Sequence, residues 1–252
     1  MKLFLIRHAE SANNRLALDL GYDEYMAQRY IDPPLTELGR RQAQMVAQHL
    51  ADNQHPERPS EQSAAPERSG YGITHLYCSA MLRSLETAAP IGQALGLRPA
   101  IWIDIHEHGG MFRGNPRTGE GLEVAPGLNR RQIQEQFPDV LIPDEVTDEG
   151  WWFQGYEDMP ACYGRATRVA RDLRRRAQEL SNNEVEESVA LVSHGTFIDS
   201  LIKALFNQIP AREFYYQHYN TAITRIDFMP DGVLLIRYIN RIQHLPPDMV
   251  SR

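Results

Sequence analysis

Four short apolar runs recur along the 252-residue chain, at residues 1–6, 73–78, 101–105 and 189–192. Each run has the length and the branched or apolar character of a buried strand, and helical patterns lie between the runs. Strands that alternate with helices predict a largely parallel sheet with helices on both faces. We therefore expect an α/β fold, a three-layer α/β/α sandwich with a mostly parallel central sheet.

Reactive side chains follow each of these runs. Arg7 and His8 come directly after the first run, Glu107 follows the third and His194 follows the fourth. Arg83 falls in the first turn of the helix that we expect after the second run. The carboxyl ends of parallel strands share one edge of the sheet, where open α/β sheets bind ligands. His8, Arg83, Glu107 and His194 are therefore expected to meet in one cleft.

An arginine next to a histidine at a strand end suits phosphoryl transfer. Arginine is a fixed cation with a planar fork of donors that fits phosphate oxygens. A neutral imidazole beside it can attack a phosphorus atom. The alternative is that these polar residues only cap four strands, and any one of them alone would leave that alternative open.

Several motifs in a fixed order carry a family resemblance. These motifs are residues 5–14, 32–39, 79–88, 193–195 and 220–223. At these motifs the chain resembles the histidine phosphatase superfamily, which includes phosphoglycerate mutases and many phosphatases. The matches keep the family's order and cover most of residues 1–110 and 185–240.

Two positions depart from the family pattern. Ala9 stands where the family usually has glycine, and it fits only if the backbone there keeps a negative φ. Pro90 lies inside the helix that should follow Arg83, where it would kink or end that helix. Pro90 is two turns beyond the arginine, so we expect the site to tolerate it.

The resemblance implies a role for each site residue. His8 would be the nucleophile and form a phosphohistidine intermediate, and His194 would act beside it. Glu107 would be the general acid, with Glu10 as the second choice because it is not at the family's usual proton-donor position. The implied phosphate-binding groups are Arg7, Asn14, Arg83 and the Gly195 amide. A helix expected at residues 196–207 would begin just after His194 and direct further amides at the anion.

A metal site and a cofactor are not expected. The sequence His106-Glu107-His108 is rich in ligands, but neighbouring residues of a strand point to opposite faces. The spacing also differs from that of the helical two-histidine zinc motif. We predict catalysis with no metal and no cofactor.

Composition sets the class of protein. The length supports a single domain over residues 1–252, and 42% of the residues are hydrophobic. No signal peptide and no apolar run of about 20 residues is visible, so we expect no membrane partner. The net charge of −7 argues against nucleic acid. Cys78 and Cys162 are far apart and favour a reducing, cytoplasmic setting. The expected partner is a small phosphorylated substrate, and the oligomeric state is left open.

Two insertions interrupt the alternation of strands and helices. Residues 52–72 are polar and rich in proline and serine, which predicts a mobile loop. Residues 108–160 begin right after Glu107 and are expected to form a lid over the cleft. The aromatic residues at 151–153 are interpreted as the core of this lid. Its candidates for binding a second anionic group are Arg113, Arg117, Arg130 and Arg131.

Three functions remain open from the sequence. The leading prediction is a phosphatase that hydrolyses a small phosphomonoester through a phosphohistidine intermediate. The alternative is a phosphoglycerate mutase that uses the same pocket, although the family's paired-arginine segment of the insertion is missing and Trp151-Trp152 fills a comparable region. The third is a catalytically silent phosphate-binding protein, which the intact set of site residues disfavours.

Overall fold

The computed structural model describes residues 1–53, 70–211 and 213–252. The predicted mobile loop at about residues 52–72 therefore lies mostly outside the described residues. Among the helices of the described residues, none is long and apolar enough to cross a membrane.

A six-stranded sheet in the order β3-β2-β6-β1-β7-β8 runs through the molecule. Strands β3, β2, β6 and β1 are parallel, whereas β7 and β8 each run antiparallel to the preceding neighbour. Every residue of the central strand β6 is buried, as expected for a strand covered on both faces. The strands are β1 (Lys2–Arg7), β2 (His75–Cys78), β3 (Ala100–Ile101), β6 (Ser188–Ser193), β7 (Ile223–Phe228) and β8 (Leu234–Arg241).

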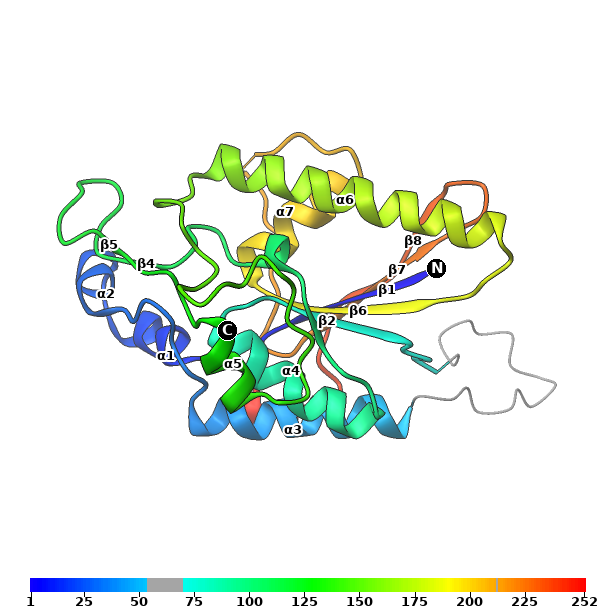
Figure 1. The fold of residues 1–252 in the computed structure, drawn as a ribbon, viewed down its shortest axis with the longest axis horizontal. Helices are drawn as coiled ribbons and strands as arrows, with labels where there is room; N and C mark the ends of the chain where they lie inside the picture. Colours follow the sequence, from blue (N-terminus) through cyan, green and yellow to red (C-terminus); the bar gives the residue numbers. More distant parts are fainter. Residues whose placement is uncertain (54–69, 212) are drawn as a thin grey trace.

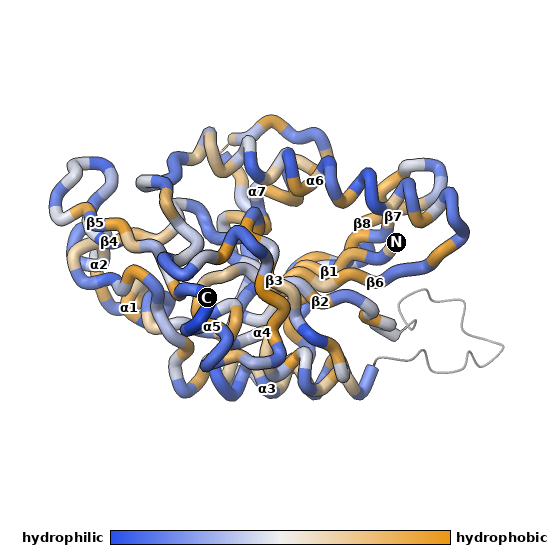
Figure 2. The backbone as a smooth tube through the Cα atoms, in the orientation of Figure 1, coloured by the Kyte–Doolittle hydropathy of each residue, from blue (hydrophilic) through white to orange (hydrophobic). Residues whose placement is uncertain are grey.

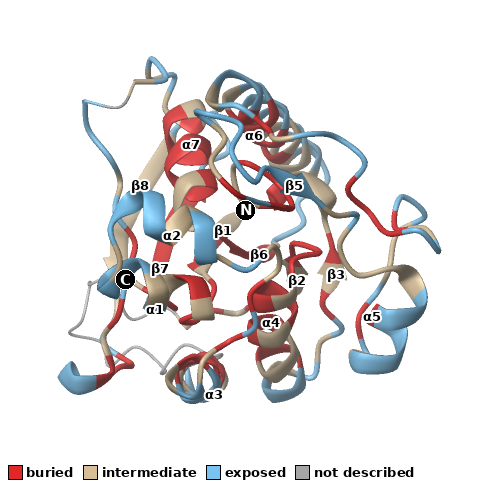
Figure 3. Cartoon of the chain, turned by 90° about the vertical axis from the view of Figure 1, so that its left-hand side faces the viewer, coloured by how far each residue is buried: buried red, intermediate tan, exposed pale blue. Residues whose placement is uncertain are grey.

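Helices cover both faces of this sheet (Figure 1). Helices α3 (Glu37–Asp52) and α4 (Leu82–Leu95) pack on one face, and α6 (Met159–Asn182) and α7 (Gly195–Leu205) pack on the other. Figure 3 shows the same three layers in a view turned by a quarter. The predicted three-layer α/β/α sandwich with a mostly parallel sheet is confirmed.

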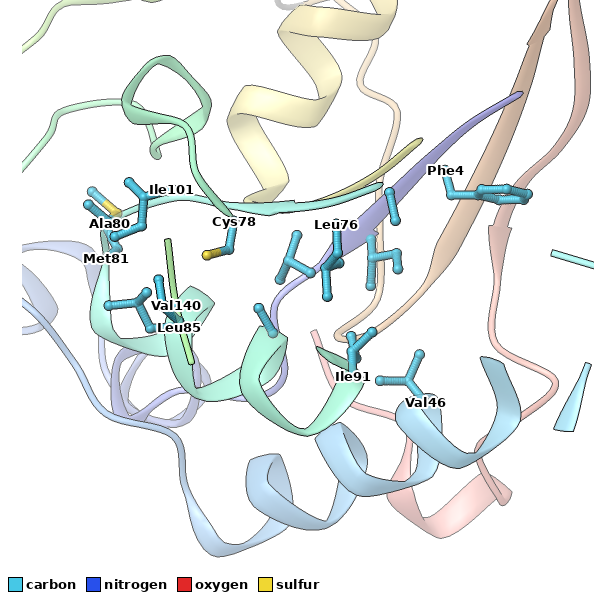
Figure 4. Close-up of a cluster of buried hydrophobic side chains, with 14 of the residues drawn as sticks. Phe4, Val46, Leu76, Cys78, Ala80, Met81, Leu85, Ile91, Ile101 and Val140 are labelled. Atoms are coloured by element: carbon cyan, nitrogen blue, oxygen red, sulfur yellow. The ribbon is translucent and has the colours of Figure 1, made fainter. Parts of the chain in front are cut away.

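The core divides into two layers, one on each face of the sheet. Successive residues of β1 alternate between them, because side chains of a strand point to opposite faces. Phe4 and Ile6 join the cluster under α3 and α4, part of which Figure 4 shows, whereas Leu3 and Leu5 join the cluster under α6 and α7. Figure 2 shows hydrophobic positions concentrated in the strands and hydrophilic positions along α6 and the outer loops.

One predicted strand is much shorter than expected. Of residues 101–105, only Ile101 is in a strand, and Ile103–Ile105 form the 3₁₀ turn η2. The Ile101 N–H donates to the carbonyl of Leu141, which belongs to the insertion. The chain then turns into the molecule, and Ile105 is fully buried in the cluster under α6 and α7. Burial of Ile105 explains the apolar run without a long strand.

The two departures from the family pattern are accommodated. Ala9 needs only an ordinary backbone conformation, since it does not have a positive φ, and its N–H donates to Thr87 Oγ1 at 3.0 Å. Helix α4 continues through Pro90 to Leu95 and ends at Gly96, which adopts a left-handed conformation with φ of +66°. Pro90 therefore does not end the helix.

A close approach joins α3 to the site. The Thr36 side chain caps α3 by accepting from the Gly39 N–H at 2.9 Å. A Cβ atom on Gly39 would lie 2.0 Å from the carbonyl oxygen of Glu10, so only glycine fits there. This contact holds the start of α3 against the segment that follows β1.

Short elements gather at the end of the sheet opposite the N-terminus (Figure 1). They are α1 (Ala12–Asp19), α2 (Tyr22–Gln28) and the hairpin of β4 (Phe112–Arg113) and β5 (Glu123–Val124). The Gly114 N–H donates to the Met26 carbonyl and joins the hairpin to α2. The hairpin thus lies over this end of the sheet, where the insertion was expected to form a lid.

The rest of the insertion packs beside the sheet. It contains the helix α5 (Arg130–Gln136). Outside the insertion, a 3₁₀ turn, η3 (Pro247–Met249), lies near the C-terminus. Trp151 and Trp152 are buried, and both rings contact the His106 ring, whereas Phe153 is exposed. The interpretation as core therefore holds for the two tryptophans and is wrong for Phe153.

Candidate active site

The structure brings the four residues at the strand ends together around His8. The His8 ring is buried directly after β1, and its Nδ1 donates to the Ala9 carbonyl at 2.7 Å. Its Nε2 accepts from Arg83 Nε at 3.2 Å. An arginine N–H can only donate and a carbonyl can only accept, so the proton lies on Nδ1 and the lone pair on Nε2. Burial, and then Arg83 and Arg7, hold the pKa of His8 well below 6.5. His8 is a neutral imidazole with an oriented lone pair.

Arg7 and Arg83 are both buried cations at the same end of the sheet. Arg7 donates to the His218 carbonyl at 2.6 Å, and its Nε is buried without a partner among the described residues. Burial lowers the pKa of Arg7, and the charge of Glu107 opposes that effect. Arg83 lies 3.9 Å from the carboxylate of Asp32. These guanidinium groups remain charged and present unused donors for an anion.

His194 lies beside His8, with 5.0 Å between the two ring centres. Its Nε2 is 2.7 Å from the hydroxyl of Ser79. That hydroxyl also accepts from the Met81 N–H, and the described residues offer its proton no recorded acceptor except His194. Ser79 therefore donates to Nε2, and the ring proton lies on Nδ1, which is buried without a partner among the described residues. Burial, and then Arg83, lower the pKa of His194 well below 6.5.

Glu107 caps the start of α7. One carboxylate oxygen accepts from the N–H groups of His108 at 2.8 Å and Phe197 at 3.0 Å, and the other accepts from Thr196 at 3.2 Å. Two of the first amides of α7 therefore bind Glu107, and the expectation that they face the phosphate is wrong for this pair. Gly195 lies closer to Arg7, since a Cβ built on it would be 3.5 Å from Arg7 Nε.

Asn14 presents its amino group to the site. Its Oδ1 accepts from the Ser11 N–H at 3.1 Å, the Ser11 hydroxyl at 2.9 Å and Asn220 Nδ2 at 3.3 Å. Asn14 also lines the site cavity. Because the oxygen is occupied, the Nδ2 donor is the group left for a ligand.

Glu10 points away from the site. It is buried, and its carboxylate accepts from the Thr36 hydroxyl at 2.7 Å near the start of α3. Glu107 lines the cavity and Glu10 does not. Of the two carboxylates, Glu107 is therefore the one that lies at the cavity, and its role as general acid stays a prediction.

A cavity of about 350 Å³ opens over His8. Of the four candidate arginines of the insertion, only Arg117 lines it. Arg113 pairs with Glu123, Arg131 pairs with Glu135, and Arg130 donates to two carbonyls. The walls of the cavity also contain residues that the sequence analysis missed: Ser11, Asn13, Tyr22, Tyr25, Met26, Arg29, Pro33, His108, Phe112, Pro116, Tyr156 and Thr196.

Arg165 is a further residue that the sequence analysis missed. Its guanidinium is buried and makes two hydrogen bonds, of 2.8 and 2.6 Å, to the carboxylate of Glu157. Another of its nitrogens donates to the carbonyls of Asp104 and His106, each at 2.8 Å. Arg165 therefore anchors the segment that carries Glu107 to α6. Only its place on an amphipathic helix was visible in the sequence.

The three ligand-type residues at 106–108 point in different directions. His106 Nδ1 donates to the Ile103 carbonyl and its ring faces the tryptophans, Glu107 caps α7, and His108 lies against Tyr156. Within residues 1–53, 70–211 and 213–252, no group of three or more histidine, cysteine, aspartate or glutamate side chains is arranged to hold a metal ion.

The chain is similar in sequence and in fold to several known proteins. A probable phosphoglycerate mutase GpmB of Yersinia enterocolitica is 24% identical over 90% of this chain and 85% of its own length. The crystal structure of a phosphoserine phosphatase mutant of Entamoeba histolytica in complex with phosphoserine is similar with a TM-score of 0.57, at 22% identity, over 97% of this chain and 99% of that chain. A mycobacterial glucosyl-3-phosphoglycerate phosphatase has a TM-score of 0.54, at 19% identity, over 95% and 98% of the two chains.

These solved structures share the fold of the chain. The family description that matches the sequence is the histidine phosphatase superfamily, branch 1, at residues 3–59 and 58–241. The matched residues include both site histidines, both buried arginines and Glu107. The chain belongs to branch 1 of the histidine phosphatase superfamily.

Proposed function

We propose that the chain is a phosphatase that hydrolyses a small phosphomonoester through a phosphohistidine at His8. The observation that carries this proposal is the orientation of the His8 ring. Its Nδ1 proton is held by the Ala9 carbonyl, and its Nε2 lone pair lies 3.2 Å from the Arg83 guanidinium. A nucleophile with a fixed lone pair next to cations that attract phosphate is arranged for attack on phosphorus.

In the first step, His8 Nε2 forms a bond to phosphorus and the bond from phosphorus to the ester oxygen breaks. Glu107 gives its proton to the leaving oxygen, which departs as an alcohol. In the second step, water attacks the phosphohistidine, Glu107 takes a proton from this water, and the bond between phosphorus and Nε2 breaks. The products are inorganic phosphate, the alcohol and the neutral His8 ring.

Charge stabilisation by fixed groups is the larger part of the expected catalysis. Arg7, Arg83, the His194 Nδ1–H, the Asn14 amino group and the Gly195 amide would surround the phosphoryl group. At an effective dielectric constant near 20, one cation about 4 Å from a phosphoryl charge contributes roughly 4 kcal/mol. Because these donors are already in place, little reorganisation is required in the transition state.

The first test is phosphate release from a panel of small phosphomonoesters, with a chelator present. We expect turnover by the wild-type protein and a loss of about 10³-fold or more in kcat for His8→Ala, because the nucleophile is gone. His75→Ala is the matched control, since this half-exposed histidine is bound near Glu187 and does not line the cavity. Wild-type protein that releases no phosphate from any ester contradicts the proposal.

Quenching the reaction at alkaline pH tests the intermediate. The phosphoramidate bond of phosphohistidine survives alkali and is lost in acid. We expect mass spectrometry to find one phosphoryl group on the peptide that contains His8 and none on the His194 peptide. A phosphoryl group elsewhere would assign the nucleophile to another residue.

A phosphoglycerate mutase is the second candidate, because relatives of this chain carry that name. Interconversion of 2- and 3-phosphoglycerate with a bisphosphorylated primer, faster than release of phosphate, would establish it. Binding of phosphate with neither reaction would instead favour a silent phosphate-binding protein.

We also infer a cytoplasmic setting, supported by two buried cysteines, Cys78 and Cys162, that form no disulfide. Cell fractionation tests that inference.

A further inference from the structure

The peptide group between Ala9 and Glu10 holds the ring of His8. Its carbonyl, that of Ala9, accepts the Nδ1 proton of His8 at 2.7 Å. Its N–H, that of Glu10, donates to the side-chain oxygen of Gln42 in α3 at 2.8 Å. A peptide group is planar and stiff, so a bond that fixes the N–H also fixes the direction of the carbonyl. The fully buried Gln42 side chain therefore sets the direction of the acceptor that holds His8.

Residues 249–251 set the orientation of the Gln42 amide. Its Nε2 donates to the Met249 carbonyl at 2.7 Å and to the Ser251 hydroxyl oxygen at 2.8 Å. An amide rotated by half a turn would set two donors against each other at Glu10 and two acceptors against each other at Met249. Only one orientation satisfies all of these groups, and it directs the Gln42 oxygen at the Glu10 N–H.

Ser251 extends the same network to the other side of His8. Its hydroxyl donates to Asn220 Oδ1 at 3.1 Å, and its carbonyl accepts from the Asn220 N–H at 3.0 Å. The Asn220 amino group donates in turn to the His8 carbonyl at 3.0 Å. These bonds close a ring from His8 through Asn220, Ser251 and Gln42 to Glu10. Asn220 is fully buried and Ser251 is 9% exposed, so the ring lies inside the protein.

Two consecutive peptide groups next to the nucleophile are thus held at both of their polar ends. In the first, the His8 carbonyl accepts from Asn220 and the Ala9 N–H donates to Thr87. In the second, the Ala9 carbonyl accepts from the His8 ring and the Glu10 N–H donates to Gln42. A buried network in which each of these groups is satisfied resists rotation of either peptide group, because rotation would leave a buried donor or acceptor unpaired.

We propose that Gln42 and Ser251 are positioning residues for the nucleophile, which keep the His8 Nε2 lone pair directed at the phosphoryl site. The proposal rests on the proposed function, in which His8 attacks phosphorus. Neither residue lines the cavity, so both act through the Ala9–Glu10 peptide group and not on the substrate. A displaced nucleophile slows the attack on phosphorus, whereas the arginines that line the cavity still bind phosphate.

The kinetic test separates attack from binding. For the ester of the panel that turns over fastest, we expect Gln42→Met to lower kcat/KM by about tenfold or more and Ser251→Ala to lower it by about threefold or more. The inhibition constant of inorganic phosphate should stay within about twofold in both variants. Ser251→Thr keeps the hydroxyl and should restore most of the kcat/KM that Ser251→Ala loses.

Two control variants remove the same side chains outside the ring. Gln48 lies exposed on α3, and Ser188 is buried at the start of β6, at the end of the sheet away from His8. Gln48→Met and Ser188→Ala should leave kcat/KM within about twofold of the wild type. Thermal unfolding of each variant establishes that it folds, and if Gln42→Met does not fold, Ser251→Ala and Ser251→Thr decide.

Other kinetic results overturn the proposal. A folded Gln42→Met protein with wild-type kcat/KM would show that the Ala9–Glu10 peptide group needs no support from α3. A loss of phosphate binding in proportion to the loss of kcat/KM would show a general disturbance of the site. A Ser251→Thr protein as slow as Ser251→Ala would show that the hydroxyl has no part in it.

A measurement without turnover keeps this proposal apart from the proposed function. In protein with ¹⁵N-labelled histidine, NMR follows the exchange of the His8 Nδ1 proton with water. We expect a slow exchange in the wild type that becomes about tenfold or more faster in Gln42→Met and stays unchanged in Gln48→Met. Equal rates in the wild type and Gln42→Met, or a wild-type proton that exchanges too fast to observe, overturn the positioning role. A protein that hydrolyses no ester but shows the expected rates would refute the phosphatase and keep the ring.

Discussion

Among single residues, Asp32 carries a carboxylate whose charged form is disfavoured by its burial in the folded protein. Its carboxylate is nearly buried at the start of α4, accepts from the Leu82 N–H and lies 3.9 Å from Arg83. Burial raises its pKa to about 6, because the loss of water outweighs the attraction of Arg83. Asp32 is therefore kept near Arg83 at the expense of the stability of the fold.

The sign of this effect gives a prediction. A folded pKa of about 6 against an ordinary value of 3.8 means that Asp32 destabilises the fold at pH 7, and that this effect fades as the pH falls toward 4. Asp32→Asn should raise the free energy of unfolding at pH 7 by about 1–3 kcal/mol. Urea denaturation at pH 7 and pH 4.5 measures this change in the free energy of unfolding, and we expect a smaller increase at the lower pH.

Asp19→Asn is the control, because that carboxylate is half exposed in a surface pair with Arg15. This substitution should change the free energy of unfolding by no more than about 0.5 kcal/mol. An Asp32→Asn protein that is less stable than the wild type at pH 7 would show that the pair with Arg83 outweighs the cost of burial.

At the scale of elements, the position of α3 depends on one missing side chain. Gly39 lets the first turn of α3 approach the Glu10 carbonyl, where a Cβ would lie 2.0 Å from the oxygen. Gly39→Ala should lower the free energy of unfolding by about 1–3 kcal/mol and reduce phosphate release, because the segment after His8 must move. Chemical denaturation and the phosphate assay measure the two effects.

Gly164 of α6 provides the matched control. It is an exposed helical glycine, and a Cβ on it would have no neighbour within 4 Å. Gly164→Ala should raise the free energy of unfolding by about 0.5–1 kcal/mol, because alanine loses less backbone entropy in a helix. Equal responses at the two glycines would show that the contact with Glu10 has no energetic weight.

The elements were predictable where local pattern and tertiary contacts agree. The apolar runs behind Arg7 and Ser193 form central strands, and the helix predicted at residues 196–207 is α7, Gly195–Leu205. The run at 101–105 misled because its burial comes from a turn into the core next to Leu141, a residue forty positions later. Nothing in the local pattern distinguishes a buried turn of this kind from a buried strand.

At the scale of the whole molecule, buried histidines make stability depend on pH. Burial lowers the pKa of each of them, to about 4 for His218 and His244. The folded state therefore stays neutral while the unfolded chain takes up protons below pH 6.5, so stability falls as the pH decreases from about 6.5 toward 4. The five residues are His8, His106, His194, His218 and His244.

We expect the free energy of unfolding to fall by several kcal/mol between pH 7 and pH 5, with about 2 kcal/mol from each fully buried histidine. Asp32 acts in the opposite direction and offsets only part of this loss. Urea denaturation at pH 7, 6 and 5 measures the slope, and His244→Asn should reduce it. Stability that is constant or rises toward pH 5 would contradict the prediction.

The sequence predicted the residues at the edge of the sheet better than those in the outer wall of the cavity. His8, Arg83, Glu107 and His194 follow strands or begin a helix, so the topology alone brings them to one edge. Arg29 follows a short helix with no buried residue, and its place depends on a ring of the distant β4–β5 hairpin. Such a contact between two surface segments leaves no periodic signal in the sequence.

The contact between α2 and the β4–β5 hairpin also bears on how selectivity can change. The groups proposed for phosphoryl transfer lie at the ends of core strands or in the first turns of helices, whereas Arg29 and Arg117 lie on two surface segments that hold each other through Phe112 and Met26. These segments could be transplanted as a pair between proteins of this fold without repacking the core. Exchange of these two segments would then change the substrate preference, while the residues at the sheet edge stay unchanged.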